Sequence, residues 1–208
     1  MDDYTELLPG DGSANTKAFF YHVPDSRRGA ILVGGIGGVW HKPADALYPK
    51  PSLDLAGMGI SGPRVGYRDP HAPKGSVHDT VVGCNYLQQQ GVDTIGLAGH
   101  WVGGAVGIQT AQSHPSVRVV ITLSAQTYGA LSVHKQRAGC VILFIHGRND
   151  ATLPSSCSKQ LHCLAKSPRK LVIYSGANHS LDSVSDKVET EIHDWFEHCL
   201  LHPMIERS

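Results

Sequence analysis

The stretch IGLAGHWVGGAVGIQTA, residues 95–111, holds the first residues whose types and spacing point to chemistry. An apolar run leads into Gly99 and a helical pattern follows Gly103, so the sequence predicts a strand, a sharp turn and a helix. Such a frame presents a nucleophilic hydroxyl at the turn, where its oxygen can attack a carbonyl carbon. The residue at this turn is Trp101. Its indole N–H only donates, so it supplies no nucleophile.

Three further segments carry residue types that work together in catalytic sites. They are VGGIGG at residues 33–38, HGRNDATLP at residues 146–154 and GANHSLD at residues 176–182, each after an apolar run. The glycine loop lacks the G-x-G-x-x-G spacing and the Walker A lysine, which leaves nucleotide binding as a distant alternative. Taken alone, Asp150 fits ordinary Asn-Asp turn chemistry, and His179 fits a loop histidine without a function.

Together and in this order, the four segments resemble the α/β-hydrolase superfamily. The similarity is to its small members without a cap domain, such as dienelactone hydrolases and bacterial carboxylesterases, and it covers nearly the whole chain. The resemblance implies that Asp150 is the acid that orients a histidine and that His179 is the general base. It also implies that residue 101 is the nucleophile position, because the superfamily has the order nucleophile, acid, histidine.

The resemblance further implies an oxyanion hole beside the turn. The N–H of Val102 is the expected first donor, because the helix that follows points its free N–H groups and positive end at the turn. The second donor is expected from the glycine loop, at Ile36 with its neighbour Gly35, since glycines let the backbone approach a ligand closely. Small residues are needed around the strained turn, and the chain supplies Gly99, Gly103 and Gly104.

Trp101 is predicted to impair or abolish hydrolysis through an acyl-enzyme. Losing one member of a catalytic triad costs on the order of a million-fold in turnover. Neither neighbour is expected to replace it, because His100 lies on the other side of the turn and Ser124 ends the next strand. The turn is expected either to relax to a negative φ or to stay strained at about 1–3 kcal/mol. A natural pseudoenzyme and an engineered substitution are both compatible with the sequence.

The elements that must position these residues follow from the hydrophobic pattern. Apolar, β-branched runs alternate with helical segments, which predicts an α/β fold with a mostly parallel central sheet of about seven strands and helices on both faces. Strands are expected at residues 17–23, 30–34, 64–67, 94–99, 118–123, 140–146 and 171–174. Helices are expected at residues 44–57, 76–90, 104–113, 154–166 and 181–199. In the last of these, an apolar stripe predicts a core-facing side: Val184, Val188, Ile192, Trp195 and Phe196.

The chain is expected to form a single domain over residues 1–208, without a cap. The connection between residues 123 and 140 is too short for an added domain, so a site above the sheet is expected to be open. Specificity would then lie in short loops near Trp40 and at residues 67–74 and 128–137, whose side chains do not identify a substrate.

Composition argues against several classes of partner. The 18 Lys and Arg residues balance 18 Asp and Glu residues among 208, so no net charge favours nucleic acid or an anionic membrane. No apolar run approaches the ~20 residues of a membrane span, and the acidic start MDDYTELLPG lacks an export pattern. A cytoplasmic location without a cofactor is therefore expected.

The cysteines lack the paired spacing of a disulfide framework or a zinc site. Cys157 and Cys163 flank His162, but no CxxC pair supports a metal, and no metal site is expected. Free thiols are expected at all five positions: Cys84, Cys140, Cys157, Cys163 and Cys199.

Three functions stay open at this point. The first is a hydrolase whose parent form acts on small carboxylic esters, lactones or thioesters, and which is crippled in this chain. The second is a binding protein that uses Trp101 as an aromatic floor for a small apolar ligand or a partner's side chain. The third is direct activation of water by His179 and Asp150. The sequence does not indicate an oligomeric state.

Overall fold

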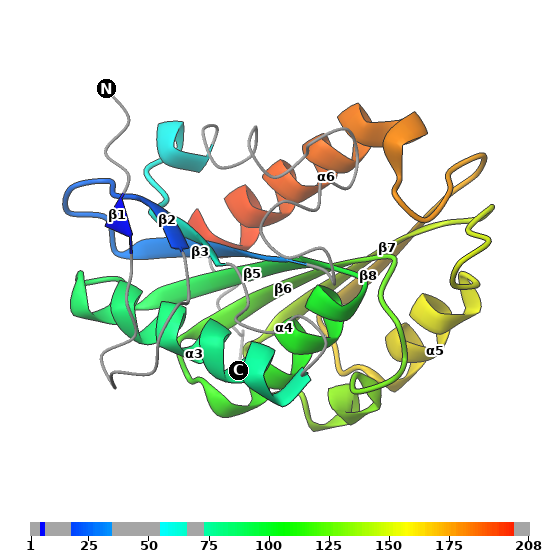
Figure 1. The fold of residues 1–208 in the computed structure, drawn as a ribbon, viewed down its shortest axis with the longest axis horizontal. Helices are drawn as coiled ribbons and strands as arrows, with labels where there is room; N and C mark the ends of the chain where they lie inside the picture. Colours follow the sequence, from blue (N-terminus) through cyan, green and yellow to red (C-terminus); the bar gives the residue numbers. More distant parts are fainter. Residues whose placement is uncertain (1–4, 7–17, 35–54, 66–72, 202–208) are drawn as a thin grey trace.

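The computed structural model describes residues 5–6, 18–34, 55–65 and 73–201, which build one twisted sheet flanked by helices (Figure 1). The sheet has eight strands in the order β1-β2-β4-β3-β5-β6-β7-β8. The strands are β1 (Thr5–Glu6), β2 (Ala18–Tyr21), β3 (Arg28–Val33), β4 (Gly62–Val65), β5 (Thr94–His100), β6 (Val117–Leu123), β7 (Val141–Gly147) and β8 (Arg169–Tyr174).

The prediction of a mostly parallel sheet is confirmed. Strands β3 to β8 pair in parallel, and only β1 and β2 join the edge in antiparallel fashion. The sequence missed β1, because two residues are too few to show an alternating pattern. The strand expected at residues 64–67 begins earlier, at Gly62, and residues 66–67 lie outside the described part. Because β5, β7 and β8 are parallel, their carboxyl ends meet at one edge of the sheet.

The described helices are α3 (Pro73–Gln89), α4 (Val102–Ser113), α5 (Ser156–Leu164) and α6 (Ser185–Phe196). The predicted helix at 181–199 is divided into the 3-10 turn η2 (Asp182–Val184), α6 and the π-helical turn η3 (Glu197–Leu201). Leu181 has φ 64, a left-handed conformation that an α-helix cannot include, so the α-helix starts later than the apolar pattern. Of the helix expected at 44–57, residues 55–57 are helical and the others lie outside the described residues.

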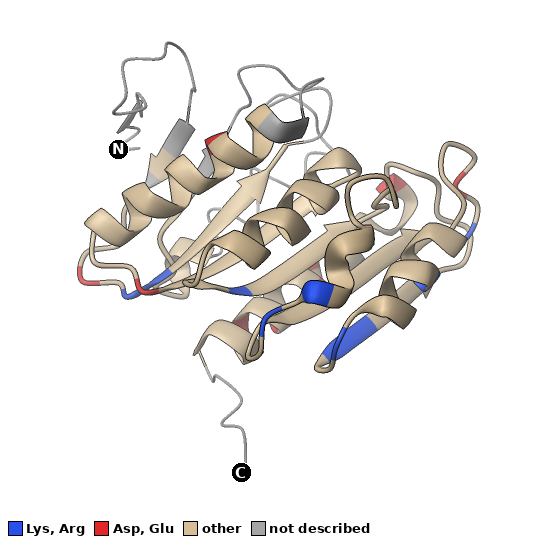
Figure 2. Ribbon diagram, turned by 90° about the horizontal axis from the view of Figure 1, so that it is seen from below, with Lys and Arg blue, Asp and Glu red and all other residues tan. Residues whose placement is uncertain are grey.

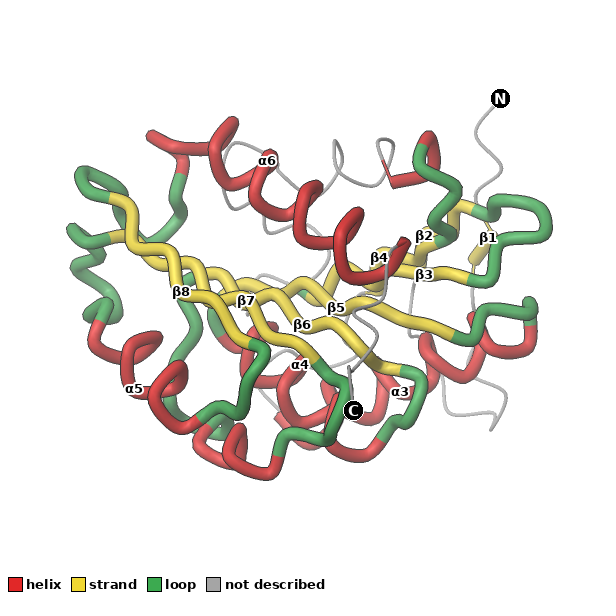
Figure 3. Tube along the Cα trace, turned by 180° about the vertical axis from the view of Figure 1, so that it is seen from behind, coloured by secondary structure: helices red, strands yellow, loops and turns green. Residues whose placement is uncertain are grey.

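The helices cover the two faces of the sheet unequally. Helices α3, α4 and α5 lie on one face and α6 lies on the other (Figures 1 and 3). The predicted stripe of α6 is buried at Val188, Ile192 and Phe196. A Cβ on Gly96 of β5 would lie 2.9 Å from Cδ1 of Phe196, so the missing side chain at Gly96 gives that ring its place.

Strand alternation decides which face each polar strand residue meets. On β5, Gly96 and Ala98 pack on the α6 side, and His100 continues that face at the end of the strand. On β7, Ile142 and Phe144 pack on the α5 side, and His146 continues that face. The side chains of His100 and His146 therefore lie at the same edge of the sheet, His100 on the face covered by α6 and His146 on the face covered by α5.

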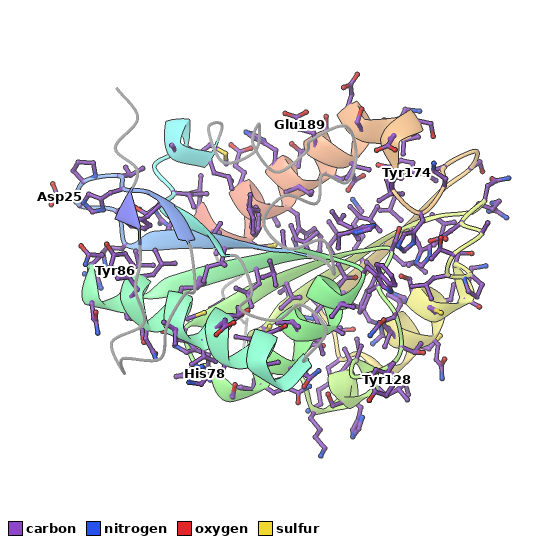
Figure 4. The ribbon with its side chains drawn as sticks, viewed as in Figure 1. Asp25, His78, Tyr86, Tyr128, Tyr174 and Glu189 are labelled. Atoms are coloured by element: carbon purple, nitrogen blue, oxygen red, sulfur yellow. The ribbon has the colours of Figure 1, made fainter. Side chains whose placement is uncertain are left out.

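The connection from β6 to β7 contains one short 3-10 helix, η1 (Leu131–Lys135), and no added domain. This agrees with the expectation that the segment is too short for a cap. Tyr128 in this connection is 76% exposed, and its ring projects away from the sheet (Figure 4).

Charged residues of the described segments lie scattered along the ribbon rather than in one continuous run of a single sign (Figure 2). Within those segments, we find no helix with both the length and the apolar character to cross a bilayer.

Candidate active site

Trp101 stands at the sharp turn between β5 and α4. Its φ is 54° and its ψ is −113°, a backbone region that residues with a side chain rarely adopt. Its N–H donates to the carbonyl of Leu123 at 2.8 Å, so β6 fixes the turn from the side. Of the two expectations for this turn, the strained one is therefore correct. The strain is imposed by the neighbouring strand and the helix start.

The glycines predicted around the turn have a steric reason. A Cβ on Gly99 would lie 2.8 Å from the N of Gly104 and nearer still to the backbone of Gly103. A Cβ on Gly103 would lie 2.6 Å from the carbonyl oxygens of Val33 and Gly34. At Gly104, the obstacle would be the Cβ of Ala125, at 2.9 Å. Strand, turn and helix can approach this closely only without these side chains.

Val102 is the first residue of α4, so its N–H has no partner within the helix. Its role as an oxyanion-hole donor stays a prediction. The other predicted donors, Gly35 and Ile36, lie outside the described residues, as does Trp40.

Asp150 follows the carboxyl end of β7, and its carboxylate is fully buried. Oδ1 accepts the backbone N–H groups of Thr152 at 2.8 Å and Leu153 at 2.7 Å. Burial alone would raise the pKa of Asp150. The hydrogen bonds from the Leu153 N–H and from His179, together with that of Thr152, outweigh the burial and hold this pKa below its usual value. The group is therefore an anion at neutral pH.

His179 follows the end of β8, and its Nδ1 lies 2.7 Å from Oδ2 of Asp150. Because an ionised carboxylate only accepts, Nδ1 carries the proton, and in the neutral ring Nε2 is then the basic nitrogen. This Nε2 is buried and has no hydrogen-bond partner among the described residues. A buried polar atom left in this state costs about 1–3 kcal/mol.

The loops that carry Asp150 and His179 are fastened to each other. The N–H of Asn149 donates to the carbonyl of Ala177 at 2.9 Å, and the side-chain oxygen of Asn149 accepts the N–H of Gly176 at 3.0 Å. A Cβ on Gly147 would lie 2.7 Å from the carbonyl carbon of Ala177, so the loops cross in close contact. The hydroxyl of Tyr174 further connects the end of β8 to α6, because it donates to the carbonyl of Lys187 at 3.3 Å.

Trp101 and His179 are in ring contact. Their ring centroids lie 5.3 Å apart and their planes make an angle of 87°, an edge-to-face arrangement. The structure thus brings together Trp101, Asp150 and His179, the three residues for which the sequence predicted one site.

His100 lies closer to the site than the sequence suggested. Its ring is fully buried, with its centroid 4.7 Å from that of His179, and its Nε2 lies 2.9 Å from the His179 carbonyl oxygen. The expectation that it lies on the other side of the turn is wrong, because His100 is on the α6 face of β5, where the loop of His179 runs. Besides this ring contact, the hydrogen bond of His100 goes to the backbone of His179, and Nε2 of His179 has no hydrogen-bond partner among the described residues.

Ser124, the other residue considered from the sequence, is not bonded to His179. It is fully buried with φ 47° at the end of β6, and its N–H donates to the carbonyl of Ile145 at 2.8 Å. Its Oγ makes no hydrogen bond within the described segments, and therefore none to His179.

His146 is a site residue that sequence reasoning missed. Its Nε2 lies 3.1 Å from Oδ2 of Asp150, the same oxygen that His179 contacts. The period-two alternation of β7 could have found it, since Ile142, Phe144 and His146 share the face covered by α5. Burial lowers the pKa of His146, against the opposing effects of the Leu153 carbonyl and Asp150.

Other polar groups lie away from this site. In the described segments, His193, Asp194 and Glu197 could offer ligand atoms to a metal, but they sit together on an outer stretch of α6 and η3, and two of them are exposed. An open groove at the amino ends of β3 and β5 is bridged by the ion pair of Arg27 and Asp93, at 2.5 Å. The carboxyl ends of the strands, which hold Asp150 and His179, form the opposite edge.

The sequence matches the model of the dienelactone hydrolase family over residues 66–194. This span is more than half of the chain, and it contains Trp101, Asp150 and His179. The protein belongs to the dienelactone hydrolase family and has the α/β-hydrolase fold. No curated protein is similar enough in sequence to be counted as a relative.

Solved structures share the fold over nearly the full length. A dienelactone hydrolase from Anabaena variabilis is 14% identical, with 94% of this chain and 97% of that chain covered and a TM-score of 0.79. A protein of unknown function from Agrobacterium tumefaciens is 15% identical, with coverages of 98% and 100% and a TM-score of 0.82. Est1E from Butyrivibrio proteoclasticus is 16% identical, with coverages of 89% and 95% and a TM-score of 0.76. Similarity at this level of identity establishes the fold alone.

Proposed function

We propose that this chain is a hydrolase-family protein in which reaction through an acyl-enzyme is impaired or lost, because Trp101 occupies the position of the nucleophile. A serine-bearing parent form would hydrolyse small carboxylic esters, lactones or thioesters. One observation carries the proposal. Trp101 keeps the strained turn, with φ 54°, and its indole faces a histidine already bonded to its acid.

In the parent form, a serine at position 101 would place its hydroxyl near Nε2 of His179. That nitrogen would accept the hydroxyl proton while Oγ bonds to the substrate carbonyl carbon. The carbonyl electron pair would move to oxygen, which the Val102 N–H would stabilise, and Asp150 would stabilise the imidazolium. The oxyanion would then re-form the carbonyl and break the bond from the carbonyl carbon to the leaving group, which takes the proton from His179. Water would attack the resulting acyl-enzyme in the same way, breaking its bond to Oγ and releasing the acid.

Trp101 removes the first of these steps. An indole has no oxygen or sulfur to bond to the carbonyl carbon, and its N–H gives His179 no nucleophile to activate. Its bulk also fills space that an acyl group would need. An enzyme that has lost part of its triad still accelerates hydrolysis by about 10³ to 10⁴ relative to the uncatalysed reaction in water. The indole is expected to reduce even this residual acceleration.

The test compares the unmodified chain with Trp101→Ser and Trp101→Ala. The alanine variant is the matched control, because it removes the indole without adding a nucleophile. With a fluorophosphonate probe and a small activated ester, we expect labelling and turnover only in Trp101→Ser. Labelling of the unmodified chain, or ester turnover by it with burst kinetics, would overturn the loss of function. A folded but inert serine variant would overturn the parent reaction.

A binding role is the second candidate, and the half-buried ring of Trp101 against His179 favours it. Aromatic rings supply large apolar contact area for a small ligand. Est1E has been solved with ferulic acid bound, which makes ferulic acid a reasonable first probe. Calorimetric titration of the unmodified chain should show binding that Trp101→Ala loses. Equal binding by both variants, or none by either, would contradict a role for the indole in this ligand's recognition.

A further inference from the structure

A second histidine is bonded to the acid of this site. His146 lies at the carboxyl end of β7, and its side chain is fully buried. Its Nδ1 lies 2.7 Å from Oγ of Ser158 on α5. Its Nε2 lies 3.1 Å from Oδ2 of Asp150 and 3.1 Å from the carbonyl oxygen of Leu153.

The partners of His146 fix its protons. Both atoms near Nε2, a carboxylate oxygen and a backbone carbonyl oxygen, can only accept, so Nε2 carries a proton. In a neutral ring Nδ1 is then an acceptor, and the hydroxyl of Ser158 is the donor that satisfies it. The ring is thus held at three points, on α5, on the turn that ends at Leu153, and on Asp150.

This arrangement fills the acceptor capacity of Asp150. Oδ1 accepts from the N–H groups of Thr152 and Leu153, and Oδ2 accepts from His146 and His179. A carboxylate with two donors on each oxygen cannot rotate without breaking a bond. The donor from His146 is one of the bonds that hold Oδ2 in the direction of His179.

We propose that His146 is a positioning residue, which holds Asp150 in the orientation that fixes the tautomer and direction of the His179 ring. The inference rests on the proposed function, because the reaction it serves is that of the parent site. It assigns a role in the site to the first residue of the segment HGRND and, through it, to Ser158. If the His179 ring were slightly misplaced, kcat of the parent reaction would fall, whereas substrate binding would not change.

The first test needs no activity. With histidine ring nitrogens labelled, NMR reports the proton on Nδ1 of His179 directly. In the unmodified chain, we expect His146→Leu to shift or broaden this resonance and His146→Gln to keep it, since a glutamine amide can donate to Oδ2. The matched control is His114→Gln, which changes another buried histidine, bonded to Asn85 at 3.2 Å and outside the site.

A merely structural role gives a different result. If His146 only supports the turn near Leu153, His146→Leu would lower stability and leave the His179 resonance in place, and the proposal would be wrong. Should His146→Leu fail to fold, Ser158→Ala serves as the milder variant. It keeps the ring but removes its anchor on α5, and it should move the same resonance by a smaller amount. An unmoved resonance in a folded Ser158→Ala would count against the proposal.

The second test uses the Trp101→Ser background. In that background, His146→Leu should lower kcat by a factor of about 10 to 100 and leave KM unchanged. His146→Gln should have a kcat close to that of Trp101→Ser alone. If Trp101→Ser is active, an unchanged kcat after adding His146→Leu would overturn the positioning role. An inert Trp101→Ser would overturn the proposed parent reaction alone, because the NMR comparison does not depend on it.

Discussion

The indole of Trp101 meets the imidazole of His179 edge to face, with ring centroids 5.3 Å apart, while Nδ1 of the same imidazole lies 2.7 Å from Asp150. One nitrogen of this imidazole is therefore hydrogen-bonded to Asp150, and the other is buried without a partner in the described part of the chain. A buried nitrogen without a hydrogen bond lowers stability. The proposed parent form would remove this cost, because a serine hydroxyl at position 101 would donate to Nε2 of His179.

The strain at position 101 can be measured by comparing Trp101→Gly with Trp101→Ala. Both variants lose the indole, but only glycine adopts φ 54° without a steric penalty. We expect Trp101→Gly to be more stable than Trp101→Ala by about 1 kcal/mol, since such strain costs about 1–3 kcal/mol and the greater unfolded-state freedom of glycine offsets part of the difference. Urea unfolding of the two variants checks this. Equal stability, or a more stable alanine variant, would mean that the turn relaxes.

The clearance around the turn predicts opposite effects of alanine at Gly99, which is beside the turn, and at Gly107, which is farther along α4. Gly99→Ala should destabilise the protein by about 3 kcal/mol or more, because the new Cβ meets the backbone of Gly103 and Gly104, which cannot move aside. Gly107→Ala on α4 is the control. Its Cβ would lie 3.4 Å from Val120 Cγ1, an ordinary contact, and alanine favours the helix by up to about 1 kcal/mol.

Thermal or urea unfolding separates these outcomes. A tolerated Gly99→Ala would show that β5 and α4 do not need to approach as closely as the structure has them. A strongly destabilising Gly107→Ala would show instead that α4 resists any added methyl group, so that the effect at Gly99 is not specific to the turn.

The lowered pKa of Asp150 leads us to expect that the stability of the protein depends on pH. Its pKa in the folded protein is lowered, so its ionised form contributes stability that is fully present above the unfolded value of about 3.9. That contribution is lost as the pH falls through the lower folded pKa. The unmodified chain should therefore lose more stability than Asp150→Asn as the pH falls from neutral to below about 3.9, and the two should converge. Urea midpoints across this range test the prediction, and a constant gap would contradict it.

Much of the fold could be predicted because its signals are local. The strands β5, β6 and β7 are mostly apolar, as is typical of strands covered on both faces, and the sequence located each within two residues. The two-residue β1 carries no pattern, and the start of α6 depends on Leu181, whose left-handed backbone no periodicity predicts. The strand β1 exists only through its pairing with β2, and the turn at Leu181 is held by hydrogen bonds from its N–H to the carbonyl and side-chain oxygens of Asn178.

The candidate site divides in the same way. Trp101, Asp150 and His179 could be named from the sequence because each follows a strand in a recognisable segment. The roles of His100 and His146 could not, because they depend on which face of the sheet each side chain leaves and on what lies there, the carbonyl of His179 in one case and Asp150 with Ser158 in the other.

The sequence by itself determined the alternation of strands and helices, the small residues at the turn, and the absence of a hydroxyl, thiol or carboxylate at position 101. Only the tertiary structure decided that the turn stays strained, that the indole faces His179, and that two imidazoles share one oxygen of Asp150. A local sequence pattern reflects which residues are adjacent in the chain and which of them are buried. The conformation of a turn and the bonds of a buried carboxylate depend on segments far apart in the chain, which meet only when parallel strands bring their ends to one edge.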